Sequence, residues 1–152
     1  MKSIRLNIRA LAFDGKTPLP AGGRITYNSS THCHELGGGP LAKYGLLRMK
    51  DLIDHDVIAA SNHVYVSWVG HSGQAGVTSF AARSYHVTQG RKVSTSPARD
   101  SNPGAHTGPV GPFTLRPTDE LALTSNGGGE QIVALELLVG TAAEVEALIA
   151  RG

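Results

Sequence analysis

The sequence predicts a mostly β protein: a jelly-roll-like β-sandwich of about eight strands, with one short internal helix and a short C-terminal helix. Composition is the first reason. Only 17% of the residues are charged and 5% are aromatic, whereas the chain holds 19 glycines and 8 prolines, which suits short strands joined by many turns. The second reason is the alternation of apolar and polar residues along several segments. A length of 152 residues further predicts a single domain, residues 1–152, that can bury one core.

Charge and cysteine content bear on partners and on stability. The net charge of +2, from 14 basic and 12 acidic residues, neither favours nor excludes an electrostatic partner. A single cysteine, Cys33, rules out an intrachain disulfide, so packing or oligomerisation must supply the stability. Arg5 and Arg9 interrupt the apolar residues at the start, and Glu136 interrupts the longest apolar run. We therefore expect neither a signal peptide nor a membrane span, and a soluble protein made in the cytoplasm.

The first strand is predicted over residues 2–10, where side chains alternate between two faces. The face expected to be buried holds Ile4, Leu6, Ile8 and Ala10. The face expected to be in water holds Ser3, Arg5, Asn7 and Arg9. Two prolines and three glycines interrupt the pattern over residues 14–23, and extended structure resumes at residues 24–28. Residues 29–40 are polar and rich in glycine, which predicts a loop.

The middle of the chain predicts one helix and two strands. The helix is expected over residues 45–56, with about three turns, because apolar residues follow at helical spacing: Leu46, Met49 and Ile53. A strand follows at residues 63–69, and one of its faces is expected to hold Val64, Val66 and Trp68. Residues 76–88 predict the next strand, interpreted as a hairpin partner across a glycine-rich turn at residues 70–76.

Residues 94–112 are predicted to form a long arm. This segment has four prolines, three glycines and scarcely any large apolar side chain, so it cannot be a core element or a central strand. Ordering it costs about 1 kcal/mol or more per residue, and Val110 is the chief apolar side chain that could offset this cost. We expect a neighbouring subunit, or the surface that the protein binds, to order the arm.

The last third of the chain is the most regular. Residues 112–117 and 118–125 predict two strands joined by a turn at residues 116–119. Their inward side chains are expected to be Phe113, Leu115, Leu121 and Leu123. Residues 130–140 predict a strand that is apolar on both faces apart from Glu136, and therefore buried centrally or at a subunit interface. Thr141 and Glu144 form a capping box for a short helix that is expected to end at Gly152.

This closing pattern, with its Pro-x-Asp-Glu-Leu turn from Pro117 to Leu121, resembles the final strands of small jelly-roll proteins. Among these, the chain is similar to the decoration, or cement, proteins that tailed bacteriophages place on their capsids. The resemblance covers the last part of the chain, together with its size and composition. It implies a virion structural protein without a cofactor, which forms a homotrimer or homodimer and binds the lattice of the major capsid protein. It carries over no functional residues.

Candidate catalytic motifs are few. Gly70-His71-Ser72-Gly73 comes near the nucleophile motif of serine hydrolases, but Gln74 stands where that motif needs glycine. A strand with a tight turn is therefore the preferred interpretation. The richest group of metal-ligating residues is His32, Cys33, His34 and Glu35. Alternation would place His32 and His34 on one side of a strand, as a cupin-like metal enzyme requires, but the spacing of the carboxylate and of the last histidine does not fit. A surface loop without metal is preferred.

The remaining candidate residues and motifs are interpreted as solvated or structural. The scattered histidines are His55, His63, His71, His86 and His106. The acidic residues near the end of the predicted helix are Asp51, Asp54 and Asp56. The glycine triplets at residues 37–39 and 127–129 lack the Lys-Ser/Thr of a phosphate-binding loop. A sparse basic run near Tyr85 predicts a charged sheet edge rather than a nucleic-acid surface; it consists of Arg83, Arg91, Lys92 and Arg99.

The sequence thus predicts a non-enzymatic virion protein that binds and stabilises an assembled capsid lattice, with no catalytic, cofactor or metal residues. We expect a homo-oligomer, with a trimer favoured, and no direct membrane or nucleic-acid partner. Two alternatives stay open. One is the metal-dependent enzyme based on His32 and His34. The other is a carbohydrate- or receptor-binding module, for which Trp68 and four tyrosines supply few aromatic surfaces.

Overall fold

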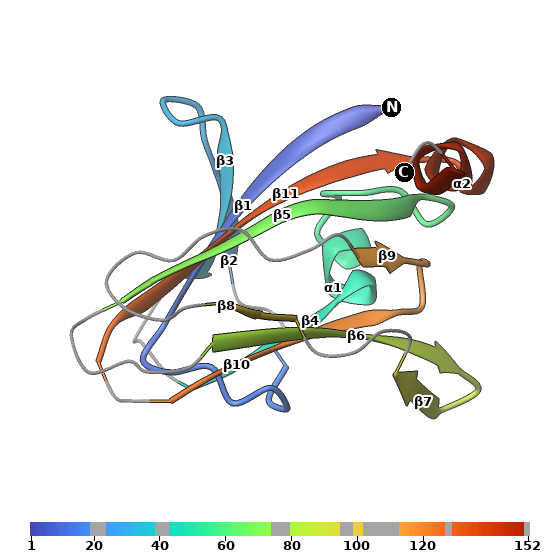
Figure 1. Cartoon of the computed structure of the whole chain (residues 1–152). Coiled ribbons are helices and arrows are strands. Elements are labelled where there is room, and N and C mark those ends of the chain that lie inside the picture. Colours follow the sequence, from blue (N-terminus) through green and yellow to red (C-terminus); the bar gives the residue numbers. More distant parts are fainter. Residues whose placement is uncertain are drawn as a thin grey trace.

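A computed structural model of the chain describes residues 1–18, 24–38, 43–73, 80–94, 99–101, 113–126 and 129–150. These residues form two β-sheets with the core between them, and they contain eleven strands and two short helices (Figure 1). The predicted mostly β sandwich with one internal and one C-terminal helix is confirmed. No helix in this described part of the chain is long and apolar enough to cross a membrane.

The larger sheet has six strands. Their order is β2 (Arg24–Asn28), β3 (Cys33–Gly38), β1 (Lys2–Ala10), β11 (Gln131–Gly140), β5 (His63–Gly73) and β9 (Phe113–Leu115). Neighbouring strands are antiparallel, except that β1 and β3 run parallel. The apolar strand predicted over residues 130–140 is β11, which lies in the middle of this sheet. The expectation that both of its faces are buried is wrong within this chain, because Ile132 is exposed and Ala134, Glu136 and Leu138 are only half-buried.

The smaller sheet has five strands. Its order is β4 (Leu46–Arg48), β10 (Glu120–Ser125), β6 (Phe80–Thr88) and β7 (Arg91–Ser94), and β8 (Arg99–Ser101) also pairs with β6. Within the predicted arm, Ser94 ends β7 and residues 99–101 form β8, so the expectation that a partner orders the arm is wrong for these residues. The rest of the arm, residues 95–98 and 102–112, lies outside the described residues. The helices are α1 (Met49–Asp54), which directly follows β4, and α2 (Ala142–Ala150), which packs at the end of β11 and β5 (Figure 1).

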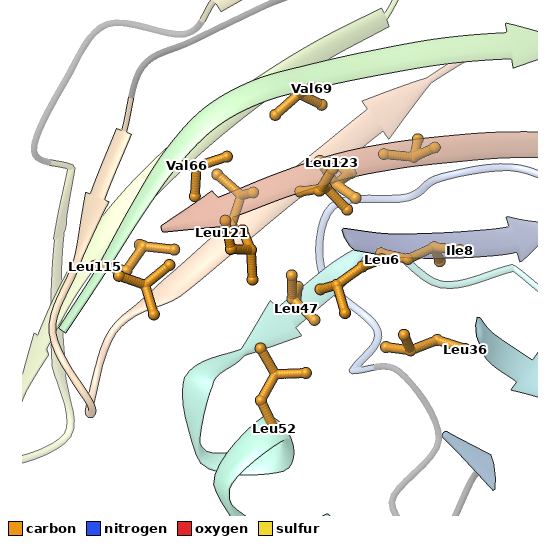
Figure 2. Packing of buried hydrophobic residues seen from close by; sticks show 14 of the residues in the cluster. Leu6, Ile8, Leu36, Leu47, Leu52, Val66, Val69, Leu115, Leu121 and Leu123 are labelled. Atoms are coloured by element: carbon orange, nitrogen blue, oxygen red, sulfur yellow. The ribbon is translucent and has the colours of Figure 1, made fainter. Parts of the chain in front are cut away.

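The core lies between the inner faces of the two sheets (Figure 2). The predicted inner face of β1 is confirmed, since Leu6, Ile8 and Ala10 are fully buried. The strands of the last third also turn the expected residues inward, and the buried ones are Phe113, Leu115, Leu121, Leu123, Val133, Leu135, Leu137 and Val139. Period-two alternation therefore identified the buried faces correctly wherever a strand is regular.

The predicted loop at residues 29–40 is wrong over residues 33–38, which form β3. This strand pairs with β2 on one side and with β1 on the other, and Leu36 lies opposite Ile8 and is buried with it. Its glycines and polar residues do not favour a strand by themselves. The hydrogen bonds to two neighbouring strands decide its conformation.

The predicted three-turn helix at residues 45–56 is also too long. Leu46 and Leu47 belong to β4, which pairs with β10, and only the six residues of α1 are helical. The spacing that predicted a helix combined the end of a buried strand with the start of a short helix. Asp56 has a positive φ of 59°, so the helical conformation does not continue beyond the end of α1.

The predicted hairpin between residues 63–69 and 76–88 is wrong. The strand β5 continues through Gly73 and pairs with β11 and β9, whereas β6 belongs to the other sheet and pairs with β10. The connection between β5 and β6 therefore crosses from one sheet to the other instead of closing a hairpin. Gly70–Gly73 is strand and not turn, and residues 74–79 lie outside the described residues.

The C-terminal capping box is confirmed. The Thr141 backbone N–H donates to Glu144 Oε1 at 3.0 Å, and the Glu144 backbone N–H donates to Thr141 Oγ1 at 3.2 Å. These two bonds satisfy donors that the first turn of α2 leaves without an intrahelical partner. The helix extends to Ala150, and its expected end at Gly152 lies outside the described residues.

Candidate binding groove on the six-stranded sheet

A groove of about 650 Å³ opens on the outer face of the six-stranded sheet. Four neighbouring strands line it: β3, β1, β11 and β5. The outward residues that line it are Arg5, Asn7, Cys33, Trp68, Ala134 and Glu136, together with Ser67. The sandwich thus carries a concave surface on the side of the sheet that faces away from the core.

The strand register aligns four of these residues in one row across the sheet. Cys33 lies opposite Arg5, Arg5 lies opposite Glu136, and Glu136 lies opposite Trp68. The next row contains Asn7, Ala134 and Gly70. The small side chain of Ala134 lines the groove beside the larger row, whereas the Trp68 ring lies over Gly70.

A β-bulge turns Trp68 outward. Val66 pairs with Leu137 and Trp68 pairs with the adjacent Glu136, so Ser67 is an extra residue in β5. The Ser67 hydroxyl donates to the Glu136 carbonyl oxygen at 3.2 Å. The expectation that Trp68 shares a face with Val64 and Val66 is therefore wrong: both valines are fully buried, whereas Trp68 is 37% exposed.

The indole ring of Trp68 lies against the backbone of Gly70. A methyl group added at Gly70 would lie 2.3 Å from Trp68 Cη2 and 2.7 Å from Cζ2. Both distances are too short for a non-bonded contact between carbon atoms. Glycine is therefore what allows the ring to rest along its own strand. The ring borders the groove, and its partly exposed aromatic face is positioned by its contact with Gly70.

The polar side chains of the row are available to a ligand. Among the residues that the structure describes, the Arg5 guanidinium, the Glu136 carboxylate and the Trp68 indole N–H have no hydrogen-bond or ion-pair partner. Arg5 offers donors only, and an ionised Glu136 offers acceptors only. The groove can therefore bind a molecule that has an apolar surface together with hydroxyl groups.

The residues of the predicted metal cluster lie in three different surroundings. Cys33 lines the groove, and Glu35 accepts a hydrogen bond from the Asn28 side-chain amide at 3.1 Å. His32 and His34 line a second pocket of about 350 Å³ beside the first half of β1. In the described ranges, no group of three or more His, Cys, Asp and Glu residues is placed to hold a metal ion. His32 and His34 share this pocket, but His32 lies in the turn before β3, so the expected alternation along a strand does not explain their proximity.

The nucleophile motif does not form a catalytic pair. Ser72 lies opposite Ile132 and faces outward, whereas the neighbouring His71 points into the core and is 2% exposed. The His71 ring stacks on Phe80 with centroids 4.6 Å apart, and its Nε2–H donates to Gln131 Oε1 at 2.8 Å. Burial lowers the pKa of His71, although the bond with Gln131 acts in the opposite direction.

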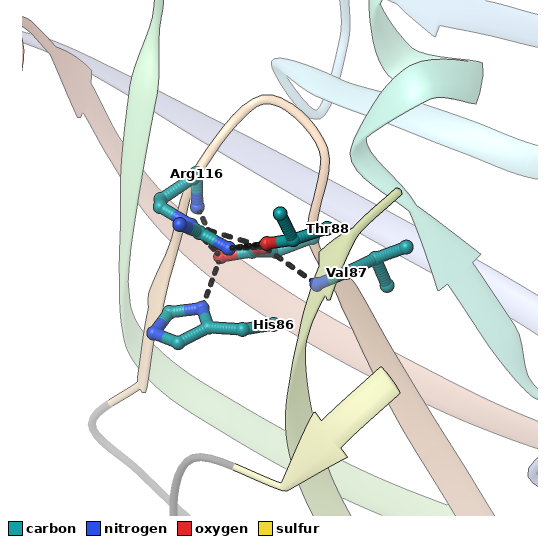
Figure 3. A network of polar contacts seen from close by, with 5 residues as sticks. His86, Val87, Thr88 and Arg116 are labelled. Carbon is teal, nitrogen blue, oxygen red and sulfur yellow. Dashed lines mark hydrogen bonds and ion pairs between the residues drawn. The ribbon is translucent and has the colours of Figure 1, made fainter. Parts of the chain in front are cut away.

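A polar network that the sequence did not single out surrounds Asp119, which is fully buried. Figure 3 labels the other members of this network, His86, Val87, Thr88 and Arg116. The Asp119 carboxylate accepts hydrogen bonds from the Arg116 backbone N–H, the Val87 backbone N–H and His86 Nδ1, at 2.8, 3.1 and 2.6 Å. Burial alone would raise the pKa of Asp119, but the hydrogen bonds from Arg116, Val87 and His86 hold it below its ordinary value. The network ties the predicted turn at residues 116–119 to β6. The aspartate at the end of the predicted turn is the sequence feature that could have indicated this network.

The other polar residues have structural positions. Asp51 is buried and accepts a bidentate ion pair from Arg48, so it is not solvated as expected, whereas Asp54 and Asp56 are exposed. In the basic run, Lys92 pairs with Glu120 and lies over the Tyr85 ring. His106 and Gly127–Gly128 lie outside the described residues.

No family model and no curated protein matches this chain. Among solved structures, it is similar over 53% of its length to the CBM22-1–GH10 modules of the Clostridium thermocellum endo-1,4-beta-D-xylanase 10B, solved with xylohexaose, at 11% identity and a TM-score of 0.35. That match covers 17% of the xylanase chain, so this chain spans a small part of that protein. The globular domain of zebrafish complement 1qA matches over 90% of this chain and 95% of that one, at 12% identity and a TM-score of 0.37. Both TM-scores are low, and neither likeness supports a conclusion about function.

Proposed function

We propose that this protein is a non-catalytic binding module that recognises a saccharide in the groove on its six-stranded sheet. One observation carries the proposal: the Trp68 ring rests on Gly70 beside the unpartnered Arg5 and Glu136 side chains. This combines an aromatic surface with a donor and an acceptor in one row. A volume of about 650 Å³ also lies within the range of small-molecule sites, about 300–1,000 Å³.

The chemistry of a sugar fits this row. A pyranose ring has a face of C–H groups, which packs on an aromatic ring, and a rim of hydroxyl groups, which need both donors and acceptors. Trp68 supplies the apolar surface with a polar N–H at its edge. Arg5 donates to hydroxyl oxygens and Glu136 accepts from hydroxyl protons. Among the described residues of the groove, no nucleophile has an acid or base placed beside it. We therefore expect the protein to bind a saccharide without converting it.

The test is a binding screen of the purified protein against oligosaccharides, followed by titration calorimetry with any that bind. We expect Trp68→Ala to abolish detectable binding, because stacking on an aromatic ring has no replacement in the row. The Ser72→Ala variant changes another outward residue of β5 and should bind as the natural sequence does. Binding that survives Trp68→Ala unchanged would overturn the assignment of the groove.

Capsid decoration is the second candidate, and the exposure of one apolar residue favours it. Ile132 is 36% exposed although β11 is a central strand, and it lies outside the residues that line the groove. An apolar side chain there could dock on a lattice or on a second subunit of the proposed trimer. Light scattering tests the oligomer, and co-sedimentation with capsids tests the lattice. In this case Ile132→Glu should weaken binding while Trp68→Ala leaves it intact, which is the opposite of the saccharide result.

A further inference from the structure

A second pocket, of about 350 Å³, lies on the core-side face of the six-stranded sheet. It is lined by Lys2, Ser3, Ile4, Arg5, Tyr27, His32 and His34. The strand register fixes the face, because His34 lies opposite the buried Leu6 and Tyr27 lies opposite His34. Trp68 and its groove lie on the other face of the same sheet, so the two cavities are separate sites.

The pocket is open because β3 covers only part of β1. Their parallel pairing begins at Arg5 opposite Cys33, and no strand that the structure describes lies beside residues 2–4 on that side. A strand edge without a neighbour presents unpaired backbone N–H and C=O groups. The turn that ends at His32, where φ is +56°, borders this edge. The pocket therefore combines side chains of the turn and of β3 with the open edge of β1.

Three rings have defined positions at this pocket. The Tyr27 hydroxyl is hydrogen-bonded to His32 Nδ1 at 3.3 Å, and the Tyr27 and His34 rings lie 5.0 Å apart. When Tyr27 donates this bond, the proton of a neutral His32 is on Nε2, and Nε2 is then a hydrogen-bond donor. The Tyr27 ring is 54% exposed, so it also offers an aromatic surface at the border of the pocket.

The charge of the pocket is positive. Lys2 shares the core-side face of β1 with Ile4, whereas the side chain of Arg5 belongs to the outer face. The lining contains no carboxylate, and Lys2 makes no ion pair within the part of the chain that the structure describes. Burial, followed by the nearby Lys2 charge, lowers the pKa of His34. The same charge would repel a metal cation from that ring, whereas it would attract an anion.

We propose that this pocket is a second binding site, separate from the groove, which takes the phosphate or sulfate group of a small ester. Three side chains that can donate hydrogen bonds line it, Lys2, His32 and His34, and a terminal phosphate or sulfate group presents three oxygens to them. A carboxylate has two oxygens and leaves one of these donors without a partner. The volume has room for more than the anionic group, and the exposed Tyr27 ring can pack against the organic part of the ester.

Titration calorimetry with small probes tests this proposal: phenyl phosphate, phenyl sulfate, inorganic sulfate and benzoate. Phenyl sulfate and benzoate carry the same single negative charge, so they differ in the geometry of the anionic group. We expect both phenyl esters to bind at least about tenfold tighter than benzoate, and tighter than inorganic sulfate, which lacks the ring. In NMR spectra, the ring signals of His32 and His34 should shift on addition of phenyl sulfate.

Variants locate the binding. Lys2→Met and His34→Leu each remove one donor and should each weaken phenyl sulfate binding by about tenfold or more. Lys50→Met removes the same charge as Lys2→Met from an exposed position on α1 and should leave the affinity unchanged. Trp68→Ala should also leave it unchanged, because Trp68 lies on the other face of the sheet. Circular dichroism shows whether each variant is folded, and the exposed Lys2→Met decides if His34→Leu is not.

Several results would overturn the second site. Benzoate that binds as tightly as phenyl sulfate would contradict the fit to three oxygens, and no detectable binding of either ester would contradict the site itself. A loss of affinity in Lys50→Met as large as that in Lys2→Met would show general charge attraction. Loss of phenyl sulfate binding in Trp68→Ala would place the probe in the groove. None of these probes is a saccharide, so failure of this proposal and failure of saccharide binding are distinguishable.

Discussion

At the level of single residues, Gly70 has a defined role because the Trp68 ring occupies the space of its missing side chain. In the Gly70→Ala variant, the new methyl group forces the indole off the strand. We expect the free energy of unfolding to fall by about 1 kcal/mol and saccharide binding to weaken. Trp68 is the only tryptophan of the chain, so its fluorescence emission and its quenching by acrylamide report the displacement directly.

The control for this prediction is Ser72→Ala, which changes the next outward residue of β5 without adding bulk near the indole. Its emission spectrum should match that of the natural sequence. An unchanged spectrum and unchanged quenching in Gly70→Ala would contradict the position of the ring on Gly70.

The buried histidine His71 predicts a dependence of stability on pH. Burial lowers its pKa in the folded state, whereas an unfolded histidine takes up a proton at about pH 6.5. Between these two values the unfolded state binds more protons, so the free energy of unfolding rises with pH and falls as the solution is acidified. We expect stability to decrease from about pH 7 downward, and His71→Gln to reduce this slope, as measured by urea unfolding at a series of pH values.

His34 must be included in this experiment because its pKa is also lowered. The His34→Gln variant should remove a separate part of the slope, and the double variant should remove the sum, since the two residues lie on different sides of β1. A slope that is identical in His71→Gln and in the natural sequence would show that His71 does not titrate with the unfolding reaction.

At the level of elements, the bulge in β5 explains how one extra residue reorients a face. Without Ser67, Val66 would still pair with Leu137 and Trp68 with Glu136, as they do in the natural sequence. The register of β5 on β11 would therefore be unchanged on both sides of the deletion. We therefore expect deletion of Ser67 to preserve the fold, the buried position of Val69 and the outward position of Trp68. Circular dichroism and tryptophan fluorescence should both resemble those of the full chain.

Deletion of Tyr65 is the matched comparison, because Tyr65 is a regular strand position opposite Leu138. Losing it shifts the preceding residues by one and turns Val64 from the core to the surface. This variant should be strongly destabilised or unfolded. Equal stability of the two deletions would contradict the assignment of Ser67 as the bulged residue.

At the level of the whole molecule, the two sheets depend on each other because their inner faces share one buried core, to which Leu52 of α1 also contributes (Figure 2). Leu123 on β10 is 1% exposed in this shared core. Leu123→Ala should lower the free energy of unfolding by about 2–5 kcal/mol. Urea unfolding followed by circular dichroism and by Trp68 fluorescence measures the change, and the two signals should coincide if both sheets unfold together.

The comparison variant is Val93→Ala on β7 of the same sheet, where the valine is 61% exposed. It should change stability by no more than about 0.5 kcal/mol. Two separate transitions in either variant would show that the sheets unfold independently and would contradict a single shared core.

Much of the fold follows from local sequence pattern, and particular residues show why. The alternation of Ile4, Leu6 and Ile8 predicted the buried face of β1, and the pair Thr141 and Glu144 predicted the start of α2. Both signals are local, since a strand alternates with period two and a capping box spans four residues. The candidate site was not predicted, because its row joins Cys33, Arg5, Glu136 and Trp68 from four separate strands.

The sequence by itself thus determined the β class, most strand positions and most buried faces. Tertiary structure alone decided that β5 pairs with β11 and not with β6, that residues 33–38 form a strand, and that the Ser67 bulge turns Trp68 to the surface. The physical reason is the range of the interactions. Whether a side chain is buried can be predicted from the apolar and polar residues next to it in the sequence. Sheet membership and register instead depend on backbone hydrogen bonds between segments far apart in the chain.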